Sequence, residues 1–281
     1  MALSMLGYVF NDTFIKLVGN DLGLFQSIFI RGIFASILIA LIAWHRDALV
    51  PDGGIINTVR NKSLIVRVLA EVAGTFFFIK ALFNMPIANV TAILQVLPLT
   101  ITLGAAVFFG EAVGWRRYLA ILVGFIGVLL IVQPGSDGFN IFALSALAAT
   151  VCVTIRDLAT KNLPTTTNSV FVSMCTAFAI FAFGAIGTLF EPWQAVKASH
   201  VALLFFASIA LVAGYIFSVL CMRSGEVSFT SPFRYSILIW ALLIGYFVFG
   251  DVPDLLTLVG AVVIVASGLF TFYRERVVTQ K

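Results

Sequence analysis

The sequence predicts an all-α integral membrane protein with ten transmembrane helices, arranged as two inverted repeats of five helices each. Of the 281 residues, 61% are apolar and only 11% are charged, and the apolar residues fall in long runs. A soluble domain is about 45–50% apolar and about 25% charged. The lipid bilayer must therefore be the solvent for most of the surface. This composition excludes intrinsic disorder, a collagen-like repeat, a disulfide scaffold and a nucleic-acid-binding module.

Ten apolar segments approach the length of about 20 residues that a helix needs to cross the hydrocarbon core. Their expected ranges are 2–18, 22–44, 63–83, 86–109, 115–133, 139–160, 168–190, 200–222, 229–249 and 255–273. Only short connections and tails remain, so we expect no soluble domain. The first range is not expected to be a secretory signal, because Asp12 and Lys16 interrupt it and no basic segment precedes it.

The basic residues predict the orientation of the chain. With a cytoplasmic N-terminus, the inner connections and tail hold ten Lys and Arg residues, whereas the outer connections hold only Lys197. The ten are Arg46, Arg60, Lys62, Arg116, Arg117, Lys161, Arg223, Arg274, Arg276 and Lys281. Because cytoplasmic loops are enriched in Lys and Arg, we expect a multi-pass protein of the cell (inner) membrane with both termini in the cytoplasm.

Nine ionisable residues stand inside the predicted spans, and they are the candidate functional residues. They are the basic Lys16, Arg31, Arg67, Lys80, Arg156 and Arg234 and the acidic Asp12, Glu71 and Asp157. On insertion scales each costs about 2.5–3.5 kcal/mol at the centre of the membrane, so we expect them to face a polar interior. Because cations outnumber anions there, an anionic or zwitterionic substrate is favoured over a simple cation.

Three pairs of charged residues are spaced i, i+4 and so share a helix face. They are Asp12 with Lys16, Asp157 with Lys161, and Arg67 with Glu71. Two interpretations stay open. The pairs either hold helices in register as buried ion pairs, or act as gates or as groups that couple transport to protons.

Arg31, Lys80 and Arg234 have no acidic partner within one turn of their own helix. Each therefore needs a partner on another helix, a carbonyl, water or a substrate. For Lys80, which stands near the end of its span, snorkelling to the interface is the alternative. Gln95 and Tyr235 are also candidates for lining a polar cavity, with hydrogen bonding between helices as the alternative.

The two halves of the chain share landmarks that predict an internal repeat. Asp12-x-x-x-Lys16 recurs as Asp157-x-x-x-Lys161 at an offset of 145 residues. Phe-Phe-Gly-Glu111 recurs as Val-Phe-Gly-Asp251 at an offset of 140 residues. Each half, 1–134 and 135–281, holds five spans. Because five is odd, the second half must be inserted upside down, which is the architecture of alternating-access carriers.

This arrangement resembles the drug/metabolite transporter superfamily and its EamA-type members. The resemblance covers the whole chain and rests on the five-plus-five spans and on the Phe-Gly-acid motifs that end at Glu111 and Asp251. The strings Phe249-Gly-Asp-Val-Pro-Asp254 and Pro232-Phe-Arg-Tyr235 are similar to a bacterial subgroup associated with riboflavin or S-adenosylmethionine uptake. The resemblance implies a secondary transporter of a small organic metabolite, such as a vitamin or a nucleoside-like compound.

An intramembrane enzyme and a channel-like facilitator are the alternatives. The sequence has only two histidines and no His-Glu-x-x-His or Gly-x-Ser-x-Gly motif, so we expect no enzyme, no cofactor and no metal site. Cys152, Cys175 and Cys221 all lie in apolar runs, as buried thiols do. The expected partners are a small-molecule substrate and lipid, without nucleic acid; a homodimer stays an open alternative.

Overall fold

The protein is helical throughout the part of the chain that the computed structural model describes, and no strand occurs in that part. The described residues are 1–281 except 52–53, 112, 136–139, 165–166, 225–230 and 280–281. The helices are α1 (Ala2–Val18), α2 (Leu24–His45), α3 (Ile55–Val59), α4 (Lys62–Asn84), α5 (Ile87–Leu94), α6 (Leu97–Phe109), α7 (Trp115–Val132), α8 (Ala143–Lys161), α9 (Ser169–Gly187), α10 (Ala198–Ser224), α12 (Ser236–Ile244) and α13 (Leu255–Thr279). A 3-10 turn, η1 (Ser231–Tyr235), precedes α12, and a π-helical turn, η2 (Gly245–Phe249), follows it.

Helices occur at every one of the predicted ranges, with ends that differ by a few residues. The first residues of the ranges 139–160 and 229–249 lie outside the described part of the chain. Seven helical segments among the described residues combine the length and hydropathy that crossing a bilayer requires. A further apolar segment, Phe233–Phe249, is shorter. The short helix α3 was not predicted.

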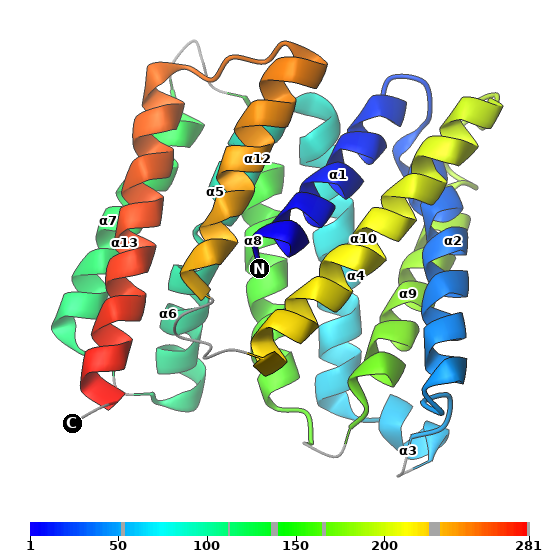
Figure 1. Cartoon of the computed structure of the whole chain (residues 1–281), viewed down its shortest axis with the longest axis horizontal. Coiled ribbons are helices and arrows are strands. Elements are labelled where there is room, and N and C mark those ends of the chain that lie inside the picture. Colours follow the sequence, from blue (N-terminus) through cyan, green and yellow to red (C-terminus); the bar gives the residue numbers. More distant parts are fainter. Residues whose placement is uncertain (52–53, 112, 136–139, 165–166, 225–230, 280–281) are drawn as a thin grey trace.

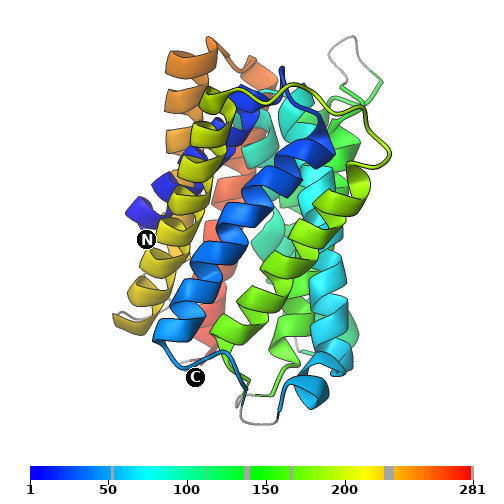
Figure 2. The same ribbon diagram turned by 90° about the vertical axis from the view of Figure 1, so that its right-hand side faces the viewer.

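The helices stand side by side as a bundle whose connections gather at two ends (Figures 1 and 2). We call the end at which α2, α6, α8 and α13 finish the basic end, because Arg46, Arg60, Lys62 and Arg116 lie there. The other end, at which α1, α4, α7, α9 and η2 finish, is called the opposite end. Successive long helices therefore run in alternating directions between the two ends.

The most extensive helix–helix contacts join segments that are far apart in the sequence. α7 packs against α13, α4 against α8, α1 against α10, and α2 against α9. In the α7–α13 contact the backbones approach closely, because a Cβ atom built on Gly127 would lie only 2.8 Å from the carbonyl oxygen of Gly260. Small residues at such contacts let the backbones of membrane helices approach closely.

The interior and the outer surface of the bundle are both apolar. One core cluster includes Ile93, Leu99 and Ile264, and a second includes Val9 and Leu204. Large apolar side chains are also exposed along the outside, as on α7 at Leu122, Ile126 and Leu129. A helix that is apolar on its outer face is stable only in lipid or against a partner, so this is a membrane protein.

Candidate functional site

Two of the predicted spans, the fourth and the ninth, are not single regular α-helices, and we call them the interrupted spans because a break or a change of helix type interrupts the α-helical pattern. The range 86–109 breaks where α5 ends at Leu94 and α6 begins at Leu97, and the range 229–249 consists of η1, α12 and η2. Pro98, in the first turn of α6, has no N–H to donate, and η1 contains Pro232. α5 packs against α12, so the two interrupted segments meet inside the bundle.

Polar atoms without partners lie on these same two segments. Asn89 Oδ1 on α5 and Ser236 Oγ and Trp240 Nε1 on α12 are buried and have no hydrogen-bond partner within the described residues. Leaving a buried polar group unpaired costs about 1–3 kcal/mol. These atoms are therefore free to bind a polar ligand or water. The sequence interpretation missed them, although a polar residue within an apolar run was the available signal.

Gln95 and Tyr235, which are 140 residues apart in the sequence, have different surroundings. Gln95 is half-buried at the break between α5 and α6, and its amide donates a long hydrogen bond, 3.5 Å, to the carbonyl of Thr91. The Tyr235 hydroxyl is buried against Gly268 of α13 and has no hydrogen-bond partner in the described part of the chain. Gln95 thus lies beside the interruption, whereas Tyr235 lies in a contact between helices.

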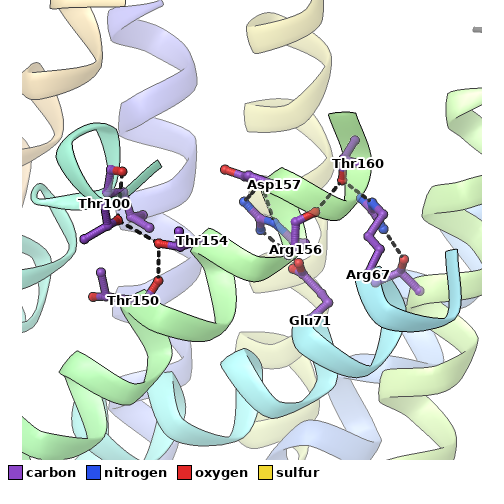
Figure 3. A network of polar contacts seen from close by, with 10 residues as sticks. Arg67, Glu71, Thr100, Thr150, Thr154, Arg156, Asp157 and Thr160 are labelled. Atoms are coloured by element: carbon purple, nitrogen blue, oxygen red, sulfur yellow. Dashed lines mark hydrogen bonds and ion pairs between the residues drawn. The ribbon is translucent and has the colours of Figure 1, made fainter. Parts of the chain in front are cut away.

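An ionic network joins α4 and α8 in the half of the bundle nearer the basic end (Figure 3). Arg156 donates a hydrogen bond of 2.9 Å to Glu71 and one of 2.8 Å to Asp157. All three side chains are partly buried, with exposed fractions of 27%, 24% and 35%. One guanidinium thus compensates two carboxylates from two helices.

Arg67 extends this network to α9. Its guanidinium donates to the hydroxyl of Thr160 at 3.0 Å and to the hydroxyl of Thr176 at 2.6 Å. Thr160 in turn donates to the carbonyl of Arg156 at 2.7 Å. The three helices α4, α8 and α9 are therefore linked by charge-assisted hydrogen bonds, which are about twice as strong as neutral ones.

A second polar cluster ties α1 to α2 and α10. Arg31 donates to the amide oxygen of Asn11 at 3.4 Å, and Asn11 donates to the carboxylate of Asp12 at 2.9 Å. All three residues are buried. Ser208 donates to the carbonyl of Arg31 at 3.2 Å. Arg31 therefore has polar partners on α1, as the inter-helix alternative expects.

The charged residues that the sequence paired at i, i+4 take other partners. Within the described residues, none of the three pairs closes as an ion pair. Lys16 donates to the carbonyls of Leu82, at 3.0 Å, and Met85, and Lys161 pairs with Glu111. The remaining four charges belong to the two clusters described above. Ion pairs between helices do occur, partly buried at Arg156–Glu71 and exposed at Lys161–Glu111, but their partners differ from the predicted ones.

Arg234 and Lys80 are both exposed in the structure. Arg234 ends the first turn of the interrupted span, close enough to Tyr8 of α1 for an electrostatic interaction. The ammonium of Lys80 lies 5.8 Å from the centre of the Phe76 ring on its own helix. The exposed position of Lys80 fits the snorkelling alternative.

Cys152 and Cys175 are free, partly buried thiols. Among the described residues no three His, Cys, Asp or Glu side chains gather where they would hold a metal ion. The side chains of Cys221, Arg223, Arg276 and Lys281 lie outside the described part of the chain.

An apolar outer surface, interrupted helices and clustered charges between helices define the class of protein: a multi-pass membrane protein whose apolar interior contains polar clusters, as in transporters. Comparison with known proteins then shows which family the chain is similar to. Residues 1–133 match the EamA-like transporter family. The first half of the chain is thus similar to this family.

Relatives with known names are similar to most of the chain. An S-adenosylmethionine uptake transporter of Rickettsia felis is 26% identical over 279 residues, which cover 98% of this chain and 91% of the relative. A riboflavin transporter of Vibrio cholerae is 28% identical over 213 residues, or 73% of this chain and 70% of the relative. A protein of known crystal structure aligns over 98% of both chains with a TM-score of 0.59 and 18% identity, which shows the fold alone.

Proposed function

We propose that this protein is a secondary carrier that moves one small organic metabolite at a time by alternating access. The observation that carries the proposal is the pair of interrupted helices, α5/α6 and η1/α12/η2, which meet at the α5–α12 contact. Discontinuous helices at corresponding positions of two repeats are the best pointer to a substrate site near the middle of the membrane. Asn89, Ser236 and Trp240 supply unpaired polar atoms beside that contact.

The second part of the proposal is an inverted repeat, with residues 1–134 as the first unit and 135–281 as the second. If α1 corresponds to α8, α4 to α10, α2 to α9 and α7 to α13, then exchanging the halves turns the α1–α10 contact into α8–α4. Both contacts are present. The same exchange maps the α2–α9 contact onto α9–α2 and the α7–α13 contact onto α13–α7, so each of these contacts is its own counterpart. The pattern of helix packing therefore supports a two-fold relation between the halves.

For the substrate, we infer a compound related to S-adenosylmethionine as the first candidate. The relatives named for its uptake cover 98% of this chain, whereas those named for riboflavin cover about three quarters. S-adenosylmethionine carries a zwitterionic amino-acid group, a sulfonium cation and an aromatic base. Paired charges, the half-buried Trp240 and the buried Tyr235 are suited to such groups.

Counterflow in proteoliposomes tests the transport proposal. Vesicles loaded with unlabelled S-adenosylmethionine should take up external labelled S-adenosylmethionine faster than empty vesicles. The same experiment with unlabelled and labelled riboflavin tests the second candidate substrate. A channel would show no acceleration, and an enzyme would convert the label to a new compound that chromatography detects. Acceleration by neither compound, in protein that keeps a cooperative thermal transition, would contradict the substrate class.

A further inference from the structure

Two lysines, one at each end of the bundle, make closely similar contacts. Lys16 is in the last turn of α1, at the opposite end, and its ammonium lies 5.4 Å from the centre of the Phe249 ring. Lys161 is the last residue of α8, at the basic end, and its ammonium lies 5.3 Å from the centre of the Phe109 ring. A cation at this distance from an aromatic ring is attracted by the ring's electrons.

Each lysine is also attracted by the acidic residue that follows its phenylalanine by two positions. Lys161 forms an ion pair with Glu111, and Asp251 attracts Lys16 electrostatically. One carboxylate oxygen of Asp251 is buried and has no hydrogen-bond partner in the described part of the chain. An acidic residue therefore attracts the lysine at each end of the bundle. Glu111 is in direct contact with Lys161, whereas Asp251 attracts Lys16 over a longer distance.

The turns that carry the two acids have the same backbone form. Gly110 and Gly250 both adopt left-handed conformations, with φ of 66° and 70°, and each ends its helix. The next residue in each case donates back to the carbonyl six positions earlier, from Glu111 to Ala105 at 3.4 Å and from Asp251 to Gly245 at 2.9 Å. These turns hold the acids where the lysines reach them.

The contacts cross between the two halves in a reciprocal way. Lys16 of the first half contacts the Phe-Gly-Asp turn of the second half, and Lys161 of the second half contacts the Phe-Gly-Glu turn of the first. The two sequence landmarks that recur at offsets of 145 and 140 residues are thus each other's partners in space. A chance packing contact would not be repeated at the other end of the molecule.

We propose that these contacts are a pair of latches, each of which holds one end of the bundle closed. The proposal rests on alternating access as the transport mechanism. Both latches are formed here, so both ends are held closed around the interior. Opening at the opposite end separates Lys16 from Phe249 and Asp251, and opening at the basic end separates Lys161 from Phe109 and Glu111.

The two latches differ in strength. Lys16 is partly buried and also donates to two carbonyls at the C-terminal end of α4, those of Leu82 and Met85. The Lys161 and Glu111 side chains are 55% and 46% exposed, and exposed ion pairs contribute little to stability. The latch at the basic end is therefore the weaker one, and the resting protein opens more readily at that end.

Distances between spin labels on the full chain in lipid nanodiscs test this proposal without any substrate. The native cysteines are first replaced by alanine. Labels at Asn20 and Val252 report on the opposite end, and labels at Asn162 and Arg116 report on the basic end; all four residues are exposed. We expect Lys16→Met to lengthen only the first distance and Lys161→Met only the second. Each change should raise the population of the open state by about two- to fivefold, the effect of losing a weak ion pair.

Two sets of variants keep the result interpretable. Lys80→Met removes an ammonium that lies over Phe76 within one helix, and it should leave both distances unchanged. The double variant Lys161→Glu with Glu111→Lys exchanges the two charges and keeps the ion pair. It should therefore return the distance at the basic end to the value of the parent protein. Phe249→Leu and Phe109→Leu repeat the test if the lysine variants fail to fold.

Unchanged distances in folded lysine and phenylalanine variants, or the same change at both ends, would overturn the latches. Because no substrate is present, this outcome is independent of counterflow. If the distances change as expected in a protein that shows no counterflow, the proposed substrate is contradicted and the latches are still supported.

Discussion

At the scale of single residues, Arg31 and Arg234 have very different environments. Arg31 is buried beside Asn11, whereas Arg234 is exposed at the start of the interrupted span. A guanidinium grips a carboxylate with two parallel hydrogen bonds, which a lysine cannot reproduce.

Conservative substitutions of these two arginines test whether either binds the substrate. We expect Arg31→Lys and Arg234→Lys each to weaken substrate binding by about tenfold, the effect of one charge-assisted hydrogen bond, in protein that still inserts. Lys80→Ala should have a smaller effect. The measurement is the affinity of purified variants for S-adenosylmethionine. Unchanged affinity in both arginine variants would show that their contacts with neighbouring helices are structural.

Asp21 links the connection after α1 to the start of α10. His200 Nδ1 accepts from the backbone N–H of Lys197 at 3.3 Å, so Nε2 carries the proton and donates to Asp21 at 2.8 Å. This hydrogen bond, with a weaker one from the Lys197 ammonium at 3.4 Å, holds the pKa of the Asp21 carboxyl below its usual value. A lowered pKa in the folded state stabilises the fold above the unfolded pKa of about 3.9.

The sign of this shift gives a pH prediction. Asp21→Asn should lower the thermal unfolding midpoint at pH 7, and the difference from the parent protein should stay constant down to about pH 5. Below about pH 4 the parent loses the same contribution as its carboxylate is protonated, so the two midpoints converge. Asp47→Asn, at an exposed position in the connection after α2, controls for the loss of charge. A difference that persists unchanged at pH 3 would contradict the assignment.

At the scale of secondary-structure elements, α2 begins with a cap that a distant part of the chain supplies. The residue before it is Gly23, which has no side chain. The carboxylate of Glu191, between α9 and α10, accepts hydrogen bonds from the N–H groups of Leu24 at 3.0 Å and Phe25 at 2.9 Å. An anion at this position satisfies two free N–H groups and complements the helix dipole.

Removing this cap should destabilise the protein measurably. Glu191→Ala is expected to cost about 1 kcal/mol, the usual effect of losing a helix cap. Glu191→Gln keeps one acceptor oxygen and should cost less. Gly23→Ala should resemble Glu191→Ala, because a Cβ atom there would overlap the carboxyl group. Thermal unfolding in detergent measures all three, and equal stability of Glu191→Ala and the parent would contradict the cap.

The sequence predicts most of these elements because length and hydropathy determine which segments cross a bilayer. Pro98 stands in the first turn after the break between α5 and α6, and Pro232 stands in the 3-10 turn that precedes α12, since proline cannot continue an intact helical hydrogen-bond pattern. α3 escaped prediction because a helix of five residues, Ile55–Val59, shows no periodic pattern. The cap by Glu191 escaped it because the two partners are 167 residues apart.

The candidate site was harder to predict than the helices. An i, i+4 spacing identifies residues on one face of a helix, but it does not say which helix that face contacts. Glu71 and Asp157 therefore share Arg156 across α4 and α8, and Arg67 reaches two threonines. The packing of the helices decides which charged residues pair, and a single sequence does not show which helices pack against each other.

At the scale of the whole molecule, the distribution of charge predicts how the bundle sits in the membrane. Seven of the ten basic residues that the sequence assigns to the inner connections and tail have described side chains, and they belong to the basic end, whereas Lys197 belongs to a connection at the opposite end. Lys and Arg are retained on the cytoplasmic side during insertion. We therefore predict that both termini face the cytoplasm, because α13 finishes at the basic end and α1, which begins part-way along the bundle, runs away from it toward the opposite end.

Labelling of single cysteines in sealed, right-side-out vesicles tests this orientation. Asn20 and Val50 are both exposed and lie in connections at opposite ends of the bundle. After replacement of the native cysteines, a membrane-impermeant maleimide should label Asn20→Cys directly and Val50→Cys only after the vesicles are permeabilised. The two variants control for each other's reactivity, because both should label fully in detergent. Direct labelling at Val50 with protection at Asn20 would reverse the orientation, and would also exchange which latch faces the cytoplasm.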